Sequence, residues 1–267
     1  MASKREREYA RRRYQKQAER AARSARLRRE RLLVAVFTVV GFGILVGGLF
    51  FANRAGQESV ETPTDVVTSD GATEPGAREP LPTTNPEQYE AAPPASDSLD
   101  QDWDVTITTN VGDITMVLHG ADAPQAVANF VFLAQNGFYD GTACHRLMPG
   151  ALLQCGDPTA TGQGGPGYAW GPIENAPEDD MYPAGTVAMA RVGGDGESMG
   201  SQFFLVYADV PLPSDAAGGY SVFGEITGGL EILQQVDAGG VDPNEIGPDG
   251  TTGRPMTDVI ITAVEVA

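Results

Sequence analysis

The segment Cys144–Asp157 reads CHRLMPGALLQCGD, and its Pro149–Gly150 pair separates two apolar runs. A Pro-Gly pair in this position is typical of a turn, because proline presets its own φ and glycine tolerates positive φ. The pattern therefore predicts a β-hairpin with His145 and Arg146 on its first strand and Gln154 on its second. A solvated arginine on an ordinary barrel hairpin explains this segment equally well, so its function has to be judged with the rest of the chain.

Two later segments change that balance. Ser201–Tyr207 reads SQFFLVY and Tyr220–Glu225 reads YSVFGE, and both are typical of strands. Taken with the hairpin, they resemble the cyclophilin family of peptidyl-prolyl cis-trans isomerases, in a bacterial, membrane-anchored form. The matching motifs are HR-x-x-PG, QCGD, the MA that precedes GSQFF, and VFG, and their order and spacing match over roughly residues 102–267.

Hydrophobic periodicity predicts a mostly β domain over residues 102–267. Besides the hairpin, strands are expected at 104–109, 113–119, 186–191, 201–207, 220–226 and 258–266, and helices at 122–136 and 230–236. About eight strands and two helices suggest a closed barrel, which leaves no exposed sheet edge. The resemblance implies the same fold, a closed eight-stranded antiparallel barrel with a helix at each open end.

Charge is distributed unevenly along the chain. Residues 1–31 hold 13 of the 18 Lys and Arg against four acidic residues, whereas residues 53–267 hold 32 acidic residues and five basic ones. We expect 1–31 to be a basic cytoplasmic tail, because basic residues beside a membrane segment mark its cytoplasmic side. No nucleic-acid partner is expected, since the rest of the chain is acidic.

Residues 32–52, LLVAVFTVVGFGILVGGLFFA, contain no charged residue and no proline. As a helix this run would extend about 31 Å, enough to cross a hydrocarbon core of about 30 Å. The alternatives are a buried helix of a soluble protein and a cleaved signal peptide. The run exceeds the roughly 7–15 apolar residues of a signal peptide, and no clean Ala-x-Ala site follows it. We therefore expect one uncleaved transmembrane helix in the cell membrane, with the rest of the chain extracytoplasmic.

Residues 53–101 are rich in Pro, Thr, Glu, Ser and Ala and contain few large apolar residues. Such a segment buries too little surface to offset its ordering entropy. We expect a disordered linker here, followed by the isomerase domain at 102–267.

Common catalytic sets are missing from the sequence. It contains no HExxH, no CxxC and no Gly-Lys-Ser/Thr phosphate loop, and His119 is expected on the surface. Ser201 has no plausible base nearby, which makes hydrolysis a weak interpretation. We expect neither a metal ion nor a cofactor.

The resemblance implies roles for particular residues. Arg146 is implied to be the catalytic hydrogen-bond donor, and Gln154 its support. The residues implied to contact substrate are His145, Leu152, Gln154, Met189, Ala190, Arg191, Phe203, Phe204, Leu212 and Tyr220. For Phe203, a place in the barrel core is an equally good interpretation. The chain departs from the family at Ala151, where a phenylalanine is usual, and at Pro211, where tryptophan is common.

Prolyl isomerisation needs no proton transfer, because its barrier of about 18–20 kcal/mol comes from partial double-bond character. A guanidinium that donates to the proline nitrogen as it pyramidalises would stabilise the twisted amide. We therefore expect an isomerase that accelerates X-Pro rotation in unfolded or exported proteins, acting as a monomer. The alternative is a non-catalytic module that binds Pro-containing segments of a partner protein.

Whether the two cysteines can form a disulfide depends on the register of the hairpin. A two-residue turn would place Cys144 opposite Cys155 and allow a disulfide. A three-residue loop would place Arg146 opposite Gln154 and turn the cysteines to opposite faces of the hairpin. The shared site that the resemblance implies for Arg146 and Gln154 favours the second register, so we expect free thiols.

Overall fold

Ten strands form one antiparallel sheet in the computed structural model, which describes residues 78–267. Their order across the sheet is β10-β11-β3-β4-β7-β6-β9-β2-β1-β12. The strands are β1 (Asp102–Thr109), β2 (Gly112–His119), β3 (Arg146–Met148), β4 (Leu152–Cys155), β6 (Thr186–Met189), β7 (Phe203–Val206), β9 (Val222–Gly228), β10 (Val241–Ile246), β11 (Gly253–Pro255) and β12 (Ile261–Val266). A separate short pair joins β5 (Met181–Tyr182) to β8 (Val210–Pro211).

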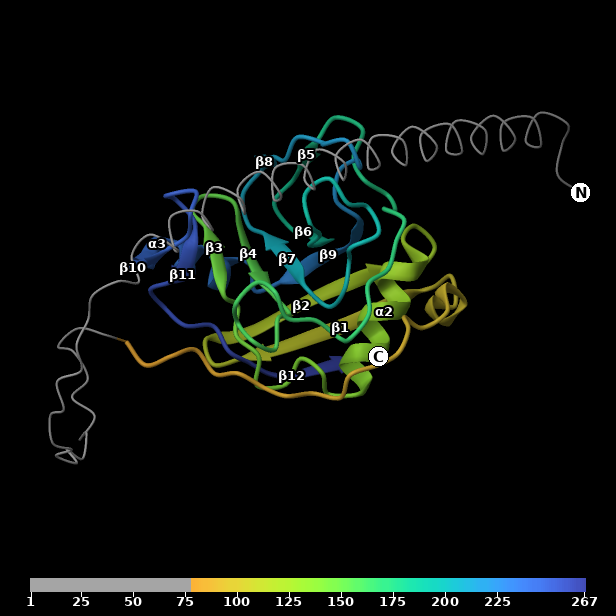
Figure 1. Ribbon diagram of the computed structural model, residues 1–267, viewed down its shortest axis with the longest axis horizontal. Helices are drawn as coiled ribbons and strands as arrows, with labels where there is room; N and C mark the ends of the chain where they lie inside the picture. Colours follow the sequence, from red (N-terminus) through yellow and green to blue (C-terminus); the bar gives the residue numbers. More distant parts are fainter. Residues whose placement is uncertain (1–77) are drawn as a thin grey trace, which may run out of the picture. The chain divides into compact units, whose positions relative to one another are not determined.

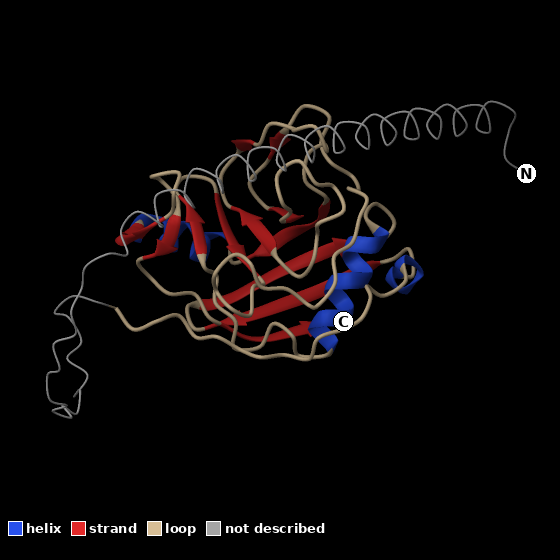
Figure 2. Ribbon diagram, in the orientation of Figure 1, coloured by secondary structure: helices blue, strands red, loops and turns tan. Residues whose placement is uncertain are grey.

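The helices are η1 (Ala95–Ser98), α2 (Pro124–Gln135) and α3 (Leu230–Gly239), and Figure 2 shows α2 and α3 at opposite ends of the sheet. Pro124 occupies the first turn of α2, where its missing N–H is not needed. The helix buries Phe130 completely, and this ring contacts Tyr139 and Phe203 at centroid distances of 4.9 and 5.3 Å. The main core thus lies between α2 and the sheet, and the predicted helices and strands are confirmed.

The prediction of a closed eight-stranded barrel is wrong, because the sheet has ten strands and β10 and β12 remain unpaired edges. The segment before β3 lies beside the start of β12, where the Gly141 N–H donates to the Ile261 carbonyl and the Ile261 N–H donates to the Thr142 carbonyl. Ala143 forms single bridges to Asp157 and Ile260, and the Cys144 N–H donates to the Val259 carbonyl over 2.9 Å. These contacts do not extend into a continuous ladder, so the sheet ends at β10 and β12 and is not closed.

The β3–β4 hairpin has the predicted register, with Arg146 opposite Gln154 and Met148 opposite Leu152. The expectation of free thiols is nevertheless wrong, because Cys144 and Cys155 form a disulfide with a Cα–Cα distance of 4.0 Å. Strict alternation of side chains applies only within the ladder, and β3 begins at Arg146, two residues after Cys144. Outside the ladder, Cys144 is free to turn toward Cys155 at the end of β4.

Residues 78–101 differ from the predicted disordered linker, because they lie on the folded body and make defined hydrogen bonds. We call residues 78–94 the strap. Figure 1 shows the strap (orange) following one side of the body from the β10–β11 end to α2. It is held by ion pairs of Arg78 with Asp242 and Asp258, which composition alone does not reveal.

The predicted basic tail at 1–31, the transmembrane helix at 32–52 and the linker up to residue 77 lie outside the described residues. Within 78–267, no helix is both long enough and apolar enough to span a membrane.

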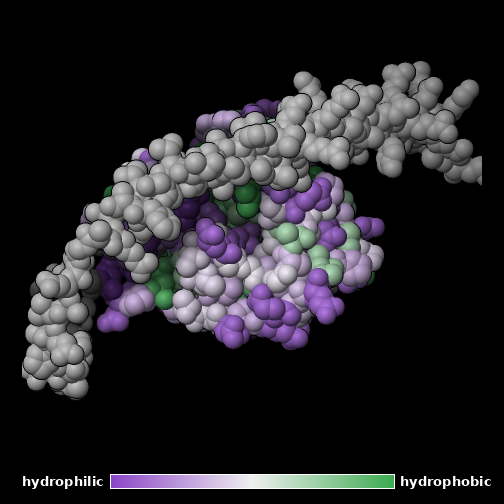
Figure 3. Space-filling model, in the orientation of Figure 1, coloured by the Kyte–Doolittle hydropathy of each residue, from purple (hydrophilic) through white to green (hydrophobic). Residues whose placement is uncertain are grey.

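On the face shown in Figure 3, hydrophobic residues gather only in small patches among hydrophilic ones.

Candidate active site

Three predicted site residues, Arg146, Gln154 and Phe204, lie in one row across neighbouring strands, and Ala188 continues the row. Arg146 on β3 pairs with Gln154 on β4, Gln154 pairs with Phe204 on β7, and Phe204 pairs with Ala188 on β6. Paired residues of adjacent strands face the same side of a sheet. The row therefore combines a guanidinium, an amide and an aromatic ring on one face.

Hydrogen bonds connect the polar members of this row. The Nη1 of Arg146 donates to Gln154 Oε1 over 3.2 Å, and Gln154 Nε2 donates to Gln202 Oε1 over 2.8 Å. The Nε2 of Gln202 donates in turn to the Gly164 carbonyl over 2.9 Å. Each amide has both ends engaged, so the position of Arg146 depends on a relay of three side chains and one backbone carbonyl.

The loop before β11 holds Arg146 from another side. Arg146 Nε donates to the Thr252 hydroxyl over 3.0 Å, and Nη2 lies 3.6 Å from Asp249 Oδ2. The Thr252 hydroxyl itself donates to the Asp249 carboxylate. Hydrogen bonds from the side chain and backbone of Thr252, together with the charge of Arg146, lower the pKa of Asp249, so this carboxylate is ionised at neutral pH.

An apolar cluster adjoins the row on the same face, separate from the main core. Its buried members are Ala151, Leu152, Tyr182, Ala188, Phe204 and Val206, and its partly buried members are Met148, Ala190, Val210, Leu212, Tyr220 and Val222. We call these residues the outer cluster. Partly buried apolar side chains beside a few fixed polar groups are typical of a ligand site. Met148 packs against this cluster, which includes Ala151.

Tyr220 and Arg191 form one edge of the outer cluster. The Tyr220 ring meets Phe204 edge to face at 5.4 Å, and the Arg191 guanidinium lies 4.8 Å from the centre of the Tyr220 ring. The Arg191 side chain is only 1% exposed, and its guanidinium donates to the Gly219 carbonyl and forms an ion pair with Asp215 at 3.0 Å. The hydrogen bond from Arg191 lowers the pKa of Asp215 to about 2. Arg191 therefore holds the Tyr220 ring and the preceding loop in place, and Asp215 neutralises the charge of Arg191.

Two predicted site residues have their side chains elsewhere. Met189 and Phe203 are fully buried in the main core, on the opposite face of the sheet from Ala188 and Phe204. For Phe203 the core interpretation is the one that the structure supports.

The side chain of His145 makes no hydrogen bond with the residues of the row. Neither ring nitrogen has a hydrogen-bond partner among the described residues, although both are buried. Burial lowers the pKa of His145; the Asp157 charge opposes this shift and the Arg146 charge adds to it. Asp157 accepts hydrogen bonds from Thr159 and Gly164, which lower its own pKa despite its burial.

Sequence reasoning missed Gln202, Thr252 and Asp249. The sequence did contain a signal for Gln202. It lies two residues before Phe204 in the GSQFF run, and alternation along a strand places both on the face that carries Gln154. Thr252 and Asp249 lie more than 100 residues from Arg146 in sequence, in a polar loop without periodicity. No local signal identifies them.

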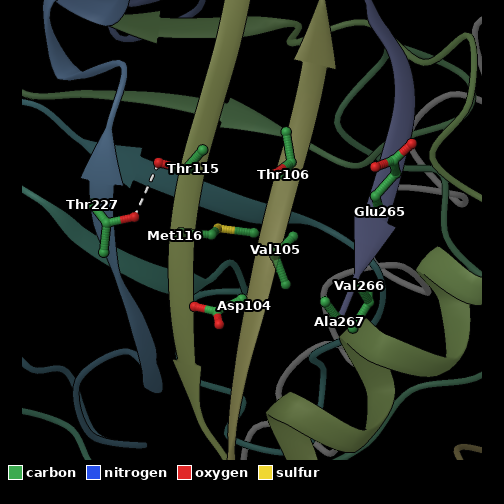
Figure 4. A pocket seen from close by; sticks show the side chains of 9 residues that line it. All are labelled: Asp104, Val105, Thr106, Thr115, Met116, Thr227, Glu265, Val266 and Ala267. Atoms are coloured by element: carbon green, nitrogen blue, oxygen red, sulfur yellow. Dashed lines mark hydrogen bonds between the residues drawn. The ribbon is translucent and has the colours of Figure 1, made fainter.

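A shallow cavity of about 320 Å³ lies on a different part of the sheet, over β1, β2, β9 and β12. Figure 4 shows its lining, where the Thr227 and Thr115 hydroxyls are joined by a hydrogen bond of 3.0 Å. None of its lining residues belongs to the Arg146 row or the outer cluster. Among residues 78–267, no three His, Cys, Asp or Glu side chains are placed to hold a metal ion together.

Residues 104–266 match the family model described as cyclophilin type peptidyl-prolyl cis-trans isomerase/CLD. The chain belongs to the cyclophilin family. This cyclophilin is 41% identical over 174 residues to the probable peptidyl-prolyl cis-trans isomerase B of Mycobacterium tuberculosis, a match that covers 60% of this chain and 53% of the relative. It thus spans about half the length of that relative.

Two further relatives match the cyclophilin more completely along their own length. A peptidyl-prolyl cis-trans isomerase of Helicobacter pylori is 43% identical over 138 residues, which is 51% of this chain and 81% of the relative. The crystal structure of a cyclophilin type peptidyl-prolyl cis-trans isomerase from Cryptosporidium parvum aligns with a TM-score of 0.52 and 30% identity, covering 62% of this chain and 98% of that one.

Proposed function

We propose that this cyclophilin is a peptidyl-prolyl cis-trans isomerase, anchored in the cell membrane, that accelerates X-Pro rotation in unfolded or exported proteins. The observation that carries the proposal is the row itself. It sets the Arg146 guanidinium and the Gln154 amide beside the apolar outer cluster, on adjacent strands of one face.

In this proposal the outer cluster holds the proline ring while one side of the X-Pro bond turns. Phe204, Leu152 and Leu212 supply apolar contact with the ring. Arg146 donates a hydrogen bond toward the proline nitrogen, which becomes a better acceptor as amide resonance is lost. A contact that is stronger in the twisted state than in the planar state lowers the barrier.

The guanidinium suits this task because it stays charged and offers several donors from one plane. Gln154 and Thr252 already engage Nη1 and Nε, so the orientation of that plane is set before substrate arrives. Such preorganisation avoids reorganisation during the reaction. No residue needs to exchange a proton.

The extracytoplasmic location is supported by two independent features. The basic residues of 1–31 precede the apolar run 32–52, which favours a cytoplasmic N-terminus. The Cys144–Cys155 disulfide is typical of an oxidising compartment. The acidic character of 53–267 disfavours nucleic acid as a partner, and we expect a monomer that binds Pro-containing segments directly.

Exchange between the cis and trans forms of a proline-containing peptide, measured by NMR with the full chain in detergent, tests the activity. We expect exchange to be accelerated in proportion to enzyme concentration. If exchange stays at its spontaneous rate while the peptide binds, the chain is instead a binding module for Pro-containing segments of a partner.

A further inference from the structure

The strap lies against a loop that reaches the candidate active site. We call residues 157–167 the Asp157 loop. The Thr84 N–H donates to the Pro158 carbonyl over 2.8 Å, and the Tyr89 N–H donates to the Pro166 carbonyl over 2.8 Å. Gln88 Nε2 donates to the Gly165 carbonyl over 3.2 Å. Three donors of the strap therefore fix carbonyls at both ends of this loop.

Packing confirms how closely the two segments approach. A Cβ at Gly167 would lie 2.8 Å from the Tyr89 carbonyl oxygen, so only glycine fits there. The Tyr89 ring packs edge to face on Phe132 of α2 at 4.8 Å. At one end the strap is anchored by Arg78, and at the other the Pro93 carbonyl accepts a hydrogen bond from Gln125.

The Asp157 loop has no helix or strand of its own. The buried Asp157 carboxylate organises it from within, accepting from the N–H groups of Thr159, Thr161 and Gly164. The carbonyl of the same Gly164 accepts the hydrogen bond from Gln202 that begins the relay to Arg146. The strap residue Gln88 and the relay residue Gln202 thus donate to neighbouring carbonyls of the same loop, those of Gly165 and Gly164.

We propose that the strap is a positioning element of the isomerase site. It holds the Asp157 loop, the Gly164 carbonyl holds Gln202, and Gln202 fixes Gln154 and thereby Arg146. The proposal rests on the proposed isomerase function. A loop without regular structure opens easily unless other segments tie it down, and small displacements of catalytic donors cost large factors in rate.

The test compares kcat/KM of full-length variants on the same peptide substrate. Tyr89→Pro removes the donor to Pro166, and Tyr89→Ala, which keeps that N–H, is its matched control. Gln88→Ala removes an exposed donor to Gly165 and carries little risk of unfolding; Gln235→Ala, an exposed glutamine of α3, is its control. We expect a loss of about tenfold for Tyr89→Pro and about threefold for Gln88→Ala, each larger than that of its control.

A double-mutant cycle separates positioning from simple loss of folded protein. In a Gln202→Ala background the relay is already broken, so Gln88→Ala and Tyr89→Pro should have little further effect. A reduced folded fraction would instead lower activity by the same factor in both backgrounds, and that result would overturn the proposal. Wild-type activity in both strap variants would also overturn it. If wild-type protein does not catalyse exchange at all, the proposed function fails and the positioning role fails with it.

Discussion

Arg146 and Gln154 lie directly opposite each other on β3 and β4, and the guanidinium Nη1 donates to the amide oxygen over 3.2 Å. The guanidinium is therefore oriented by the same hairpin that carries it. About a third of the Arg146 side chain remains exposed, on the face of the outer cluster.

Arg146→Ala should lower kcat/KM by about 10²–10³ while the protein stays folded, because a charge-assisted hydrogen bond to the twisted amide is lost. Arg146→Lys should recover little of this loss, since an ammonium cannot reproduce the planar donor set. Peptide exchange rates, with circular dichroism as the control for folding, measure both. Activity close to wild type in Arg146→Ala would remove this residue from the mechanism.

Thr252→Val should lower kcat/KM by roughly threefold to tenfold, because Arg146 Nε loses its acceptor and the guanidinium plane is less well fixed. Thr252→Ser keeps the hydroxyl and should retain most of the activity. If both variants lose activity equally, the methyl group matters and not the hydrogen bond.

Replacing both cysteines with serine should destabilise the fold by about 2–3 kcal/mol, as expected when a short loop loses its cross-link. Denaturant unfolding of wild-type and doubly substituted protein gives the difference. Thiol labelling of wild-type protein, unfolded without reductant, should detect no free thiol. Two labelled thiols per chain would contradict the Cys144–Cys155 disulfide.

The His145 environment predicts a pH-dependent stability. Its folded-state pKa lies below the ordinary value of about 6.5, so between these two values the unfolded chain binds more protons than the folded chain. Stability should therefore fall as pH drops through about 6.5 toward the lower folded-state pKa. Thermal unfolding of His145→Gln should show a smaller drop over this range. An identical pH profile in wild type and variant would show that His145 does not contribute.

External protease on intact cells should release the isomerase domain by cutting within residues 53–77, because the strap places residues 78 onward on the folded body. A C-terminal epitope should appear in the medium with a size close to that of 78–267. Protection of the domain until the cells are lysed would mean that the orientation is reversed.

The hairpin and its register were predictable, because Pro149–Gly150 marks the turn and the motif spacing pairs Arg146 with Gln154. The disulfide was not predictable in the same way. The alternation of side chains was assumed to continue to Cys144, which lies before the start of β3. At Gly156, φ is +84°, so the chain also leaves regular geometry just after Cys155.

The strap and the β10–β11 hairpin escaped prediction for a different reason. Both are held in part by ion pairs and hydrogen bonds, whereas sequence periodicity reports apolar burial. Arg78 and Arg254 both bind Asp258, and Arg254 also donates to the Glu79 carbonyl. Four of the six residues of β10 are exposed, which leaves no alternating pattern to detect.

The disulfide makes residues 144–155 a covalently closed ring that contains Arg146, Leu152 and Gln154. Pro149 and Gly150, at the tip of this ring, are exposed. A protease that cuts the peptide bond between them would open the ring but leave its two halves joined at the cysteines. The nicked protein would remain one molecule, with Arg146 still tethered to Gln154, until a reductant separated the fragments.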